Sequence, residues 1–385
     1  MKDTYLDNKI KNTCNGCGVC KLVCPVNAIE MQEDSEGFFY PQIDESKCIK
    51  CNKCKRICSN YPKRNEYDIK AYATKNKDED ERINSTSGGM FRILAKYVID
   101  KQGVVFGVKF DDDLNVIHDY AENIVKCKEF SFSKYVRSNL KDSYQKVKEF
   151  LKNDRFVLFT GTPCQVQGLR NFLQRDNEKL ILCEIICHAN PSPKVLKMYI
   201  KNNEINSGKK VKKIYFRSKN IEMNNGAYVE FEDGSKIKDT VYIKSFSSEQ
   251  LINRPSCNNC QFVDENRKAD FTIGDFWGIE RVFPEFNDKQ GISLLTVNTE
   301  KARKIFNEVK DNMEFKEVEL KLAFRDNHCS NLPQSKNRDK FFKQISDGTI
   351  NEKNIITYMN KYTKKPLYRR IFGKGKRIIK KILKK

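Results

Sequence analysis

Two cysteine runs of the same spacing dominate the beginning of this 385-residue chain. Both runs read C-x2-C-x2-C-x3-C, and they hold eight of the fifteen cysteines. The first run consists of Cys14, Cys17, Cys20 and Cys24, and the second of Cys48, Cys51, Cys54 and Cys58. A loop with a ligand at every third residue can wrap one face of an inorganic cube, whereas the fourth thiolate has to arrive from another direction. The spacing therefore predicts that these thiols bind iron–sulfur clusters.

The spacing is the signature of two-cluster bacterial ferredoxins, in which the fourth cysteine of each run ligates the cluster of the other run. On this rule, one 4Fe–4S cluster has the ligands Cys14, Cys17, Cys20 and Cys58. The second has the ligands Cys48, Cys51, Cys54 and Cys24. Zinc is the alternative, but tetrahedral zinc sites use C-x2-C pairs that are well separated in sequence. The first run ends in Cys24-Pro25, whereas Ser59 follows Cys58, which is a small departure from the pattern.

The pattern of the chain predicts three segments. A two-cluster domain is expected over residues 1–62, a larger domain over 68–345 and a C-terminal tail over 346–385, with a polar linker at 60–68. Residues 28–43 are expected to form a hairpin. In the larger domain, strands and helices alternate; we expect strands at 69–73, 103–108, 116–118, 156–159 and 180–187, a hairpin at 228–243, and a helix through 91–98. The expected fold class is an α+β ferredoxin-like domain followed by a larger α/β domain.

Charge and hydropathy limit the partners of the chain. The formal net charge is +21, but acidic residues are interspersed with lysines and no basic and aromatic stripe occurs, so no nucleic acid partner is expected. No apolar stretch reaches the roughly 18 residues of a membrane span. An odd number of thiols and the absence of an N-terminal apolar segment predict a cytoplasmic protein.

The C-terminal tail carries much of the excess charge. No acidic residue follows Glu352, and residues 364–385 contain eleven Lys or Arg; removing these from +21 leaves +10. Apolar residues from Ile371 to Leu383 fall on one helical face with basic residues around them. Such a helix is typical of peripheral contact with an anionic membrane at the inner face of the cell membrane. A frayed or partner-docked terminal helix is the alternative.

Seven cysteines lie outside the two runs, and Cys257-x2-Cys260 is the close pair among them. Taken alone, this pair is either a metal site or a chance occurrence. Cys164 follows Gly161-Thr-Pro at an expected turn from strand to helix, where a helix N-terminus favours a thiolate. Cys164 and Cys187 can equally be ordinary buried cysteines of parallel strands.

Six motifs occur in an order that resembles a known family. They are Ser85 to Gly89, Ser133-Lys-Tyr-Val, Gly161-Thr-Pro-Cys-Gln, Ile186-Cys-His with Pro191-Ser-Pro, Arg254-Pro-Ser-Cys-x2-Cys, and Asp270-Phe-Thr-Ile-Gly-Asp-Phe-Trp-Gly. Together they resemble the family of coenzyme F420 hydrogenase/dehydrogenase beta subunits, and more closely its bacterial members with an N-terminal ferredoxin domain. The resemblance covers roughly residues 1–298. The family usually has a glycine after Cys-His, whereas Ala189 and Asn190 follow His188 here.

The resemblance implies that the large domain carries FAD and a third 4Fe–4S cluster. The implied ligands of that cluster are Cys164, Cys187, Cys257 and Cys260, and we treat Cys127, Cys183 and Cys329 as packing residues. The implied FAD contacts are Ser85, Ser87, Gly88, Gly89, Ser133, Lys134, Tyr135, Ser138, Thr162, Gln165, Asp275 and Trp277. From spacing alone, the residues around Gly88 are a capped helix start and Lys134 is a surface lysine. His188 and Lys134 are the candidate catalytic residues, with packing beside a ligand as the alternative for His188.

The expected function is that of an iron–sulfur flavoprotein oxidoreductase. It would pass electrons between the ferredoxin-type clusters and a two-electron substrate through FAD, with a link to polysaccharide biosynthesis. The redox partner would be a ferredoxin or a small-molecule electron donor or acceptor. No G-x-G-x-x-G follows an expected strand, so a Rossmann nicotinamide site is not indicated. The alternative is a non-catalytic subunit that relays electrons to a partner enzyme.

Overall fold

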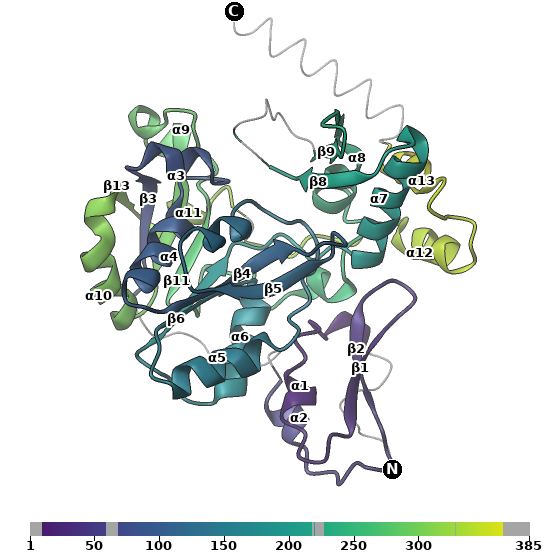
Figure 1. Cartoon of the computed structure of the whole chain (residues 1–385), viewed down its shortest axis with the longest axis horizontal. Coiled ribbons are helices and arrows are strands. Elements are labelled where there is room, and N and C mark those ends of the chain that lie inside the picture. The colour runs from purple at the N-terminus through teal and green to yellow at the C-terminus, as the bar shows by residue number, and fades with distance from the viewer. Residues whose placement is uncertain (1–9, 59–67, 218, 220–226, 328, 365–385) are drawn as a thin grey trace, which may run out of the picture.

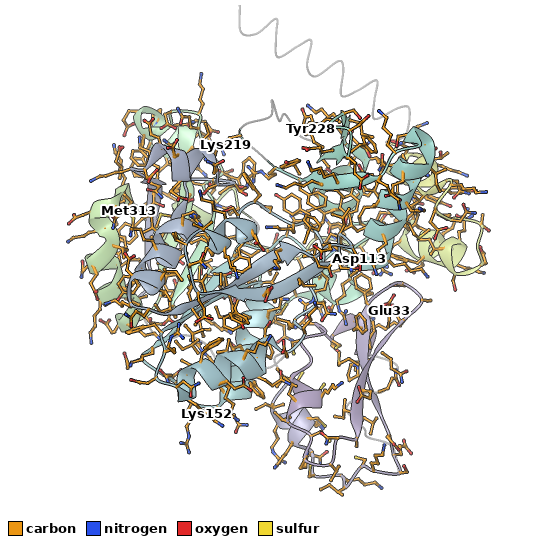
Figure 2. All side chains as sticks on the ribbon, viewed as in Figure 1. Glu33, Asp113, Lys152, Lys219, Tyr228 and Met313 are labelled. Atoms are coloured by element: carbon orange, nitrogen blue, oxygen red, sulfur yellow. The ribbon has the colours of Figure 1, made fainter. Side chains whose placement is uncertain are left out.

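The computed structural model describes residues 10–58, 68–217, 219, 227–327 and 329–364 (Figure 1). The chain begins with a small cysteine-rich domain, in which a hairpin stands beside two short helices. The hairpin pairs β1 (Ile29–Glu33) with β2 (Phe39–Ile43), and the helices are α1 (Val19–Leu22) and α2 (Lys53–Arg56). The tip of the hairpin, marked by Glu33, points toward the rest of the molecule (Figure 2). The hairpin expected over residues 28–43 is confirmed.

An eight-stranded mixed sheet forms the centre of the large domain. Its strand order is β13-β3-β12-β11-β7-β6-β4-β5, and its four middle strands β11, β7, β6 and β4 run parallel. The strands are β3 (Lys70–Asn76), β4 (Val104–Phe110), β5 (Val116–Ala121), β6 (Val157–Gly161), β7 (Leu180–Ile185), β11 (Phe271–Asp275), β12 (Ser293–Val297) and β13 (Met313–Val318). The strands expected from 69 to 187 all lie in this sheet, and the mixed α/β class is therefore confirmed.

Helices cover both faces of the sheet, as alternating apolar residues dictate. In β6, Val157 and Phe159 face a core with α5 (Ser143–Lys152) and α6 (Pro163–Leu173). Leu158 faces the opposite core, with α4 (Met90–Asp100) and α10 (Glu300–Val309). Because successive strand side chains point to opposite faces, a strand buried on both sides is apolar throughout. The helix expected through 91–98 is α4.

A second, smaller lobe is built on a three-stranded antiparallel sheet. The strands are β8 (Val211–Tyr215), β9 (Ala227–Phe231) and β10 (Lys236–Asp239). The helices are α7 (Pro193–Ser207), α8 (Val241–Ile243), α12 (Arg338–Ser346) and α13 (Ile355–Thr363). Phe38 and Tyr40 of the N-terminal hairpin are buried in the same core, so the small domain is docked against this lobe.

Two features of the lobe differ from the sequence pattern. The strand expected up to residue 243 ends at Asp239, whose Oδ1 accepts a hydrogen bond from Val241 N at 2.8 Å and starts α8 instead. The reason is packing, because a helix buries both Val241 and Tyr242 in the core. Residues 350–362 also join this core, so the chain remains packed beyond the tail boundary expected at 346. The amphipathic pattern from Ile371 and the linker at 60–67 lie outside the described residues.

The remaining helices are short and lie around the sheet. They are α3 (Glu79–Ile83), α9 (Ile279–Val282) and α11 (Leu320–Phe324). Among the described residues, no helix has both the length and the apolar character needed to span a membrane.

Candidate redox site

The carboxyl ends of three adjacent parallel strands carry three of the sequence motifs. Cys164 follows β6, Cys187 follows β7, and Asp275 ends β11. Because β6, β7 and β11 are neighbours in the sheet and run parallel, these residues emerge at the same edge. Ligands of open α/β sheets bind outside the carboxyl ends of the strands. The fold therefore brings residues more than one hundred positions apart to one edge.

The segment of Cys257 and Cys260 is hydrogen bonded to the loop after β7. Asn190 donates from its backbone N to Cys257 Sγ at 3.3 Å, and Arg254 N donates to Asn190 O at 2.9 Å. Burial raises the pKa of Cys187 well above its usual value, and the neighbouring Cys257, Cys164 and Cys260 raise it further. Burial and Cys164 likewise raise the pKa of Cys260 to about 12. All four thiols thus lie within electrostatic range of one another.

The four thiols match the ligand count of one cluster. Burial raises the pKa of Cys187, Cys257 and Cys260, and Cys164 is among the neighbouring cysteines that raise it further in all three cases. Four cysteine thiolates are the usual ligand set of a 4Fe–4S cube, so the donor set fits that group.

Cys164 lies at the start of α6 in a polar setting. Thr162 and Gln165 form a capping box, and Pro163 occupies the first turn. Arg137 Nη1 donates to Cys164 Sγ at 3.5 Å, and Thr162 Oγ1 lies 3.3 Å from the same sulfur. The helix N-terminus and the guanidinium both place positive potential at this sulfur, which suits an anionic cluster.

The thiols of the two N-terminal runs also have the surroundings of cluster ligands. Burial raises the pKa of Cys20, and Cys17, Cys14 and Cys54 raise it further. Burial also raises the pKa of Cys54, with smaller effects from Cys48 and Cys51. Backbone N–H groups of Gly16 and Ala28 donate to Cys14 Sγ and Cys24 Sγ, each at 3.3 Å. Hydrogen bonds to sulfur are among the features that set cluster potentials.

Two buried arginines connect the first run to the large domain. Arg137 donates to Cys164 Sγ and also, through Nη2, to Gly16 O at 3.1 Å. Arg254, three residues before Cys257, donates to Cys14 O at 2.7 Å and to Phe39 O at 3.0 Å. The Arg254 guanidinium also lies 4.1 Å from the centre of the Tyr40 ring. The same arginines therefore contact the backbone of the first run and the segments of the four converging cysteines.

A cavity of about 1080 Å³ opens beside Cys187. Its volume is at the upper end of the roughly 300–1,000 Å³ of small-molecule and cofactor sites. Seven residues expected at the site line it: Lys134, Tyr135, Thr162, Cys187, His188, Asp275 and Trp277. Ser85, Ser87, Gly88, Gly89, Ser133, Ser138 and Gln165 are not among its lining residues. The cavity thus brings together part of the expected cofactor set and one expected cluster ligand.

Both charged and aromatic side chains line the cavity. Burial lowers the pKa of Lys134 to about 7, and its Nζ donates to Glu129 O at 2.9 Å and Ser131 O at 2.6 Å. Arg217 forms an ion pair with Asp275, and its guanidinium lies 5.7 Å from the centre of the Trp277 ring. Aromatic faces and cationic groups are suited to a planar anionic cofactor, so these residues fit FAD.

His188 lies beside the expected ligand Cys187. Its Nε2 is 2.9 Å from Ser247 O and 2.8 Å from Gln250 Nε2. Burial lowers the pKa of His188, so the neutral ring is favoured near neutral pH.

The serine and glycine loop before α4 makes local contacts. Ser85 Oγ donates to Glu81 O at 2.7 Å, and Ser87 Oγ donates to Ile292 O at 2.8 Å. A Cβ at Gly88 would lie 2.3 Å from Thr74 O, and Gly89 has a φ of 87°. Glycine is therefore required at Gly88 for a close backbone approach. Thr86 does line the cavity, and its Oγ1 accepts from Ser133 N at 3.1 Å.

Ser138 and Gln165 lie behind Cys164 in a buried chain of hydrogen bonds. Gln165 Nε2 donates to Ser138 Oγ at 2.9 Å, and Ser138 Oγ lies 3.0 Å from His118 Nδ1. His118 Nε2 lies 3.1 Å from Thr160 O. Burial lowers the pKa of His118 to about 4. The hydrogen bond between Ser138 and Gln165 therefore stabilises the first turn of α6 on the buried side of Cys164.

Sequence reasoning missed Arg137, Arg254, Arg217, Thr86 and His118. Arg137 directly follows the motif Ser133-Lys-Tyr-Val, and Arg254 begins the motif that contains Cys257. Their place in these motifs could have pointed to both arginines. Of the three cysteines without a motif, Cys127 and Cys183 are fully buried, and Cys329 Sγ lies 3.4 Å from Phe324 O.

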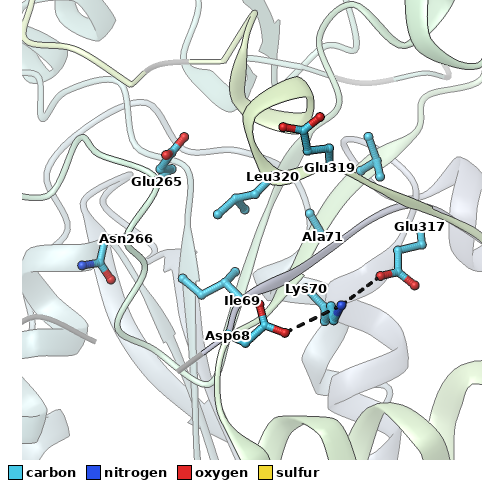
Figure 3. Close-up of a pocket in the computed structure, with 10 residues that line it drawn as sticks. Asp68, Ile69, Lys70, Ala71, Glu265, Asn266, Glu317, Glu319 and Leu320 are labelled. Carbon is cyan, nitrogen blue, oxygen red and sulfur yellow. Dashed lines mark ion pairs between the residues drawn. The ribbon is translucent and has the colours of Figure 1, made fainter. Parts of the chain in front are cut away.

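A second cavity, of about 610 Å³, lies along β3 and β13 (Figure 3). Four carboxylates line it, and Lys70 Nζ lies 3.7 Å from Asp68 Oδ2 and 3.4 Å from Glu317 Oε1. None of the residues expected at the site from the sequence lines this cavity.

Comparison with known proteins agrees with this organisation. Residues 154–321 match the family described as the C terminus of the coenzyme F420 hydrogenase/dehydrogenase beta subunit. Residues 13–60 match the 4Fe-4S dicluster domain. The second match covers the two cysteine runs, and the first covers all four converging cysteines.

Individual relatives cover parts of the chain. The F subunit of the F(420)H(2) dehydrogenase of Methanosarcina mazei is 24% identical over 188 residues, which are 44% of this chain and 51% of that protein. The chain thus spans about half the length of this relative. The B subunit of the Na(+)-translocating ferredoxin:NAD(+) oxidoreductase complex of Acetobacterium woodii is 44% identical over 45 residues, 12% of each chain. A chain of the F420-reducing [NiFe] hydrogenase complex from Methanosarcina barkeri, solved after xenon derivatization, gives a TM-score of 0.47 at 15% identity, covering 78% of this chain and 94% of that chain.

These matches relate the chain to iron–sulfur electron-transfer proteins and to redox subunits of oxidoreductase complexes. Over residues 154–321 the chain is similar to the C-terminal part of the coenzyme F420 hydrogenase/dehydrogenase beta-subunit family, and a match to the 4Fe-4S dicluster domain precedes this region at residues 13–60.

Proposed function

We propose that this protein is an iron–sulfur flavoprotein oxidoreductase with three 4Fe–4S clusters and one FAD. It would exchange electrons between the small domain and a two-electron substrate in the 1080 Å³ cavity. The observation that carries the proposal is the convergence of Cys164, Cys187, Cys257 and Cys260 at the strand ends beside that cavity. The proposed domains are 1–62 for the dicluster part and 68–345 for the FAD and cluster part.

The proposed ligand sets follow the cysteine pattern and the contacts. The two runs hold two clusters, with Cys24 and Cys58 exchanged between them. The four converging cysteines hold the third. Arg137 contributes positive charge beside Cys164 and ties that cysteine to the Gly16 backbone. This contact keeps the third site next to the first run, and electron transfer requires such proximity.

The cavity residues bind and orient the cofactor. Tyr135 and Trp277 offer aromatic surfaces, Arg217 offers positive charge, Lys134 offers an amine that can hold or release a proton near neutral pH, and Thr162 and Thr86 offer hydroxyl groups. When bound, FAD supplies chemistry that joins single-electron and two-electron transfer. His188 is the proposed proton donor and acceptor, since its neutral ring lies on the cavity wall beside Cys187. The link to polysaccharide biosynthesis stays a prediction, which turnover of candidate sugar substrates would test.

The second candidate function is an electron-relay subunit without its own catalysis. Both relatives are named as subunits of larger assemblies, which favours this interpretation. Turnover of a substrate by the isolated chain would separate the two functions.

Anaerobic reconstitution with iron and flavin quantitation tests the proposal. The wild type should bind about twelve irons and one FAD per chain. Cys257→Ala should lose about four irons, whereas Cys329→Ala, a cysteine outside the converging group, should retain all of them. A wild-type protein with about eight irons and no flavin would refute the three-cluster flavoprotein.

A further inference from the structure

The loop of the second cysteine run presents an exposed basic surface. We name residues 47–56 the outer loop and residues 14–20 the inner loop. Lys50, Lys53, Lys55 and Arg56 are all exposed, and Ile49 between them is 61% exposed. No acidic residue occurs between Lys47 and Cys58. Among the described residues, none of the four exposed cations has an ion-pair partner, whereas Lys47 pairs with Asp44 at 3.1 Å.

The inner loop has the same backbone shape but is covered at Gly16 and Val19, whereas a Cβ on Gly18 would meet nothing within 4 Å. Gly16 and Gly18 have φ of 64° and 76°, and the equivalent Lys50 and Asn52 have φ of 55° and 57°. A Cβ on Gly16 would meet Arg254 Nη1 at 3.0 Å and Phe39 O at 3.1 Å. A side chain is thus excluded where the large domain covers the inner loop.

Lys50 and Asn52 of the outer loop lie in the left-handed region, which is less favourable for a residue with a Cβ than for glycine. The same conformation occurs at other residues such as Lys141 and Lys289, so by itself it does not indicate a function. The exposed charges of the outer loop are the feature that distinguishes it from the inner loop.

The position of the two loops gives that charge a role. The inner loop is attached to the third cysteine site through Arg137 and Arg254. Val19, just after Cys17, is fully buried against α6. The cluster of the outer loop is consequently the one whose loop faces outward, where a partner can approach it.

We propose that the outer loop is the docking surface for a small acidic one-electron carrier protein of the ferredoxin or flavodoxin class. This inference rests on the proposed redox function and identifies the partner of its entry site. The reduced carrier loses one electron and the outer cluster gains it, with no bond formed or broken. The basic rim steers an acidic carrier, and Ile49 provides an apolar centre that the contact desolvates.

The test measures binding and electron uptake with the full-length reconstituted protein and a purified acidic two-cluster ferredoxin. The variant is Lys50→Glu, Lys53→Glu and Lys55→Glu combined. At low ionic strength, the dissociation constant for oxidised ferredoxin should rise at least tenfold, and the rate constant of cluster reduction by reduced ferredoxin should fall to a similar extent. The salt dependence of both quantities should also weaken.

A matched charge reversal controls for the net charge of +21. It combines Lys152→Glu, Lys197→Glu and Lys212→Glu, all exposed residues outside the small domain, with Lys152 labelled in Figure 2. This control should change either quantity less than threefold. Iron content and the extent of reduction by dithionite check that the clusters are intact, and a glutamine version of the outer-loop variant replaces it if assembly fails.

Two results would overturn the proposal. One is an outer-loop variant that binds and oxidises ferredoxin like the wild type or like the matched control. The other is an outer-loop variant that loses binding to vesicles of anionic phospholipid but not to ferredoxin, which would assign the surface to lipid. Both readouts need only the dicluster domain of the intact protein, so they remain informative even if the flavin or the third cluster is absent.

Discussion

The inner and outer loops of the small domain share a cysteine spacing and a left-handed backbone at equivalent positions, yet their surroundings are opposite. Gly16 of the inner loop lies under Arg254, and its carbonyl accepts from Arg137. Lys50 of the outer loop occupies the equivalent position and is exposed. A duplicated ligand pattern has thus become asymmetric through its neighbours. The large domain contacts the inner loop at Gly16, whereas it contacts the second run at its end, where Asn171 Nδ2 donates to Ile57 O at 2.9 Å, and leaves Lys50 exposed.

The largest expected effect comes from removing one cluster ligand from the inner loop and, separately, one from the outer loop. Cys17→Ala and Cys51→Ala should each lose about four irons per chain. Because Arg254 joins Cys14 O of the inner loop to Phe39 O of the hairpin, only Cys17→Ala should also loosen the docked hairpin. Hydrogen exchange of β1 and β2 amides, measured alongside iron content, checks this. Equal loss of protection in both variants would show that the loops are equivalent.

The buried arginine of the inner loop should have the next largest effect. Arg254→Met removes the charged donor of Cys14 O and Phe39 O, leaving both acceptors without it. We expect the free energy of unfolding to fall by about 3 kcal/mol. Arg56→Met on the exposed side should change it by less than about 0.5 kcal/mol. Chemical denaturation under anaerobic conditions measures both, and similar values for the two variants would contradict the comparison.

Low pH should destabilise the part of the large domain that contacts the inner loop, through His118, which lies behind Cys164. Burial lowers the folded pKa of His118 from 6.5 to about 4, so the unfolded state binds more protons between these values. The stabilising contribution is complete above pH 6.5 and is lost as pH falls toward 4. We expect a loss of about 1.5 kcal/mol between pH 6.5 and 5.

His118→Asn should remove this pH dependence of the free energy of unfolding. The outer loop contains no histidine, so outer-loop variants should keep it unchanged. An identical slope in wild type and His118→Asn, measured by denaturation at several pH values, would show that His118 is not responsible.

The smallest expected effect is that of exchanging the residue at the left-handed position of the outer loop, and the matching exchange in the inner loop is its comparison. Gly16→Ala places a Cβ against Arg254 in an unfavourable backbone region and should cost about 2 kcal/mol. Lys50→Gly should change the free energy of unfolding by less than about 1 kcal/mol, because relief of backbone strain is offset by a more flexible unfolded chain. Denaturant midpoints measure both. A costly Lys50→Gly would mean that the lysine side chain is structural.

Several parts of the fold and site were predictable from local pattern. The cysteine spacing predicted the dicluster domain, which the family match confirms. Apolar runs such as residues 156–159 and 180–187 predicted strands that the structure places at the centre of the sheet. The predicted end of the strand at residue 243 was wrong. Residues 240–243 have a strand-like composition, but Val241 and Tyr242 are buried in the core as part of a helix.

By itself, the sequence determined which residue types could ligate clusters, because ligand spacing within one loop is a local property of the chain. The tertiary structure alone decided that Arg137 joins Gly16 to Cys164, that Arg254 covers Gly16, and that Lys50 is exposed. Both arginines contact the inner loop across more than one hundred positions of sequence. Such contacts arise from packing of the whole molecule and leave no periodic signal in the sequence.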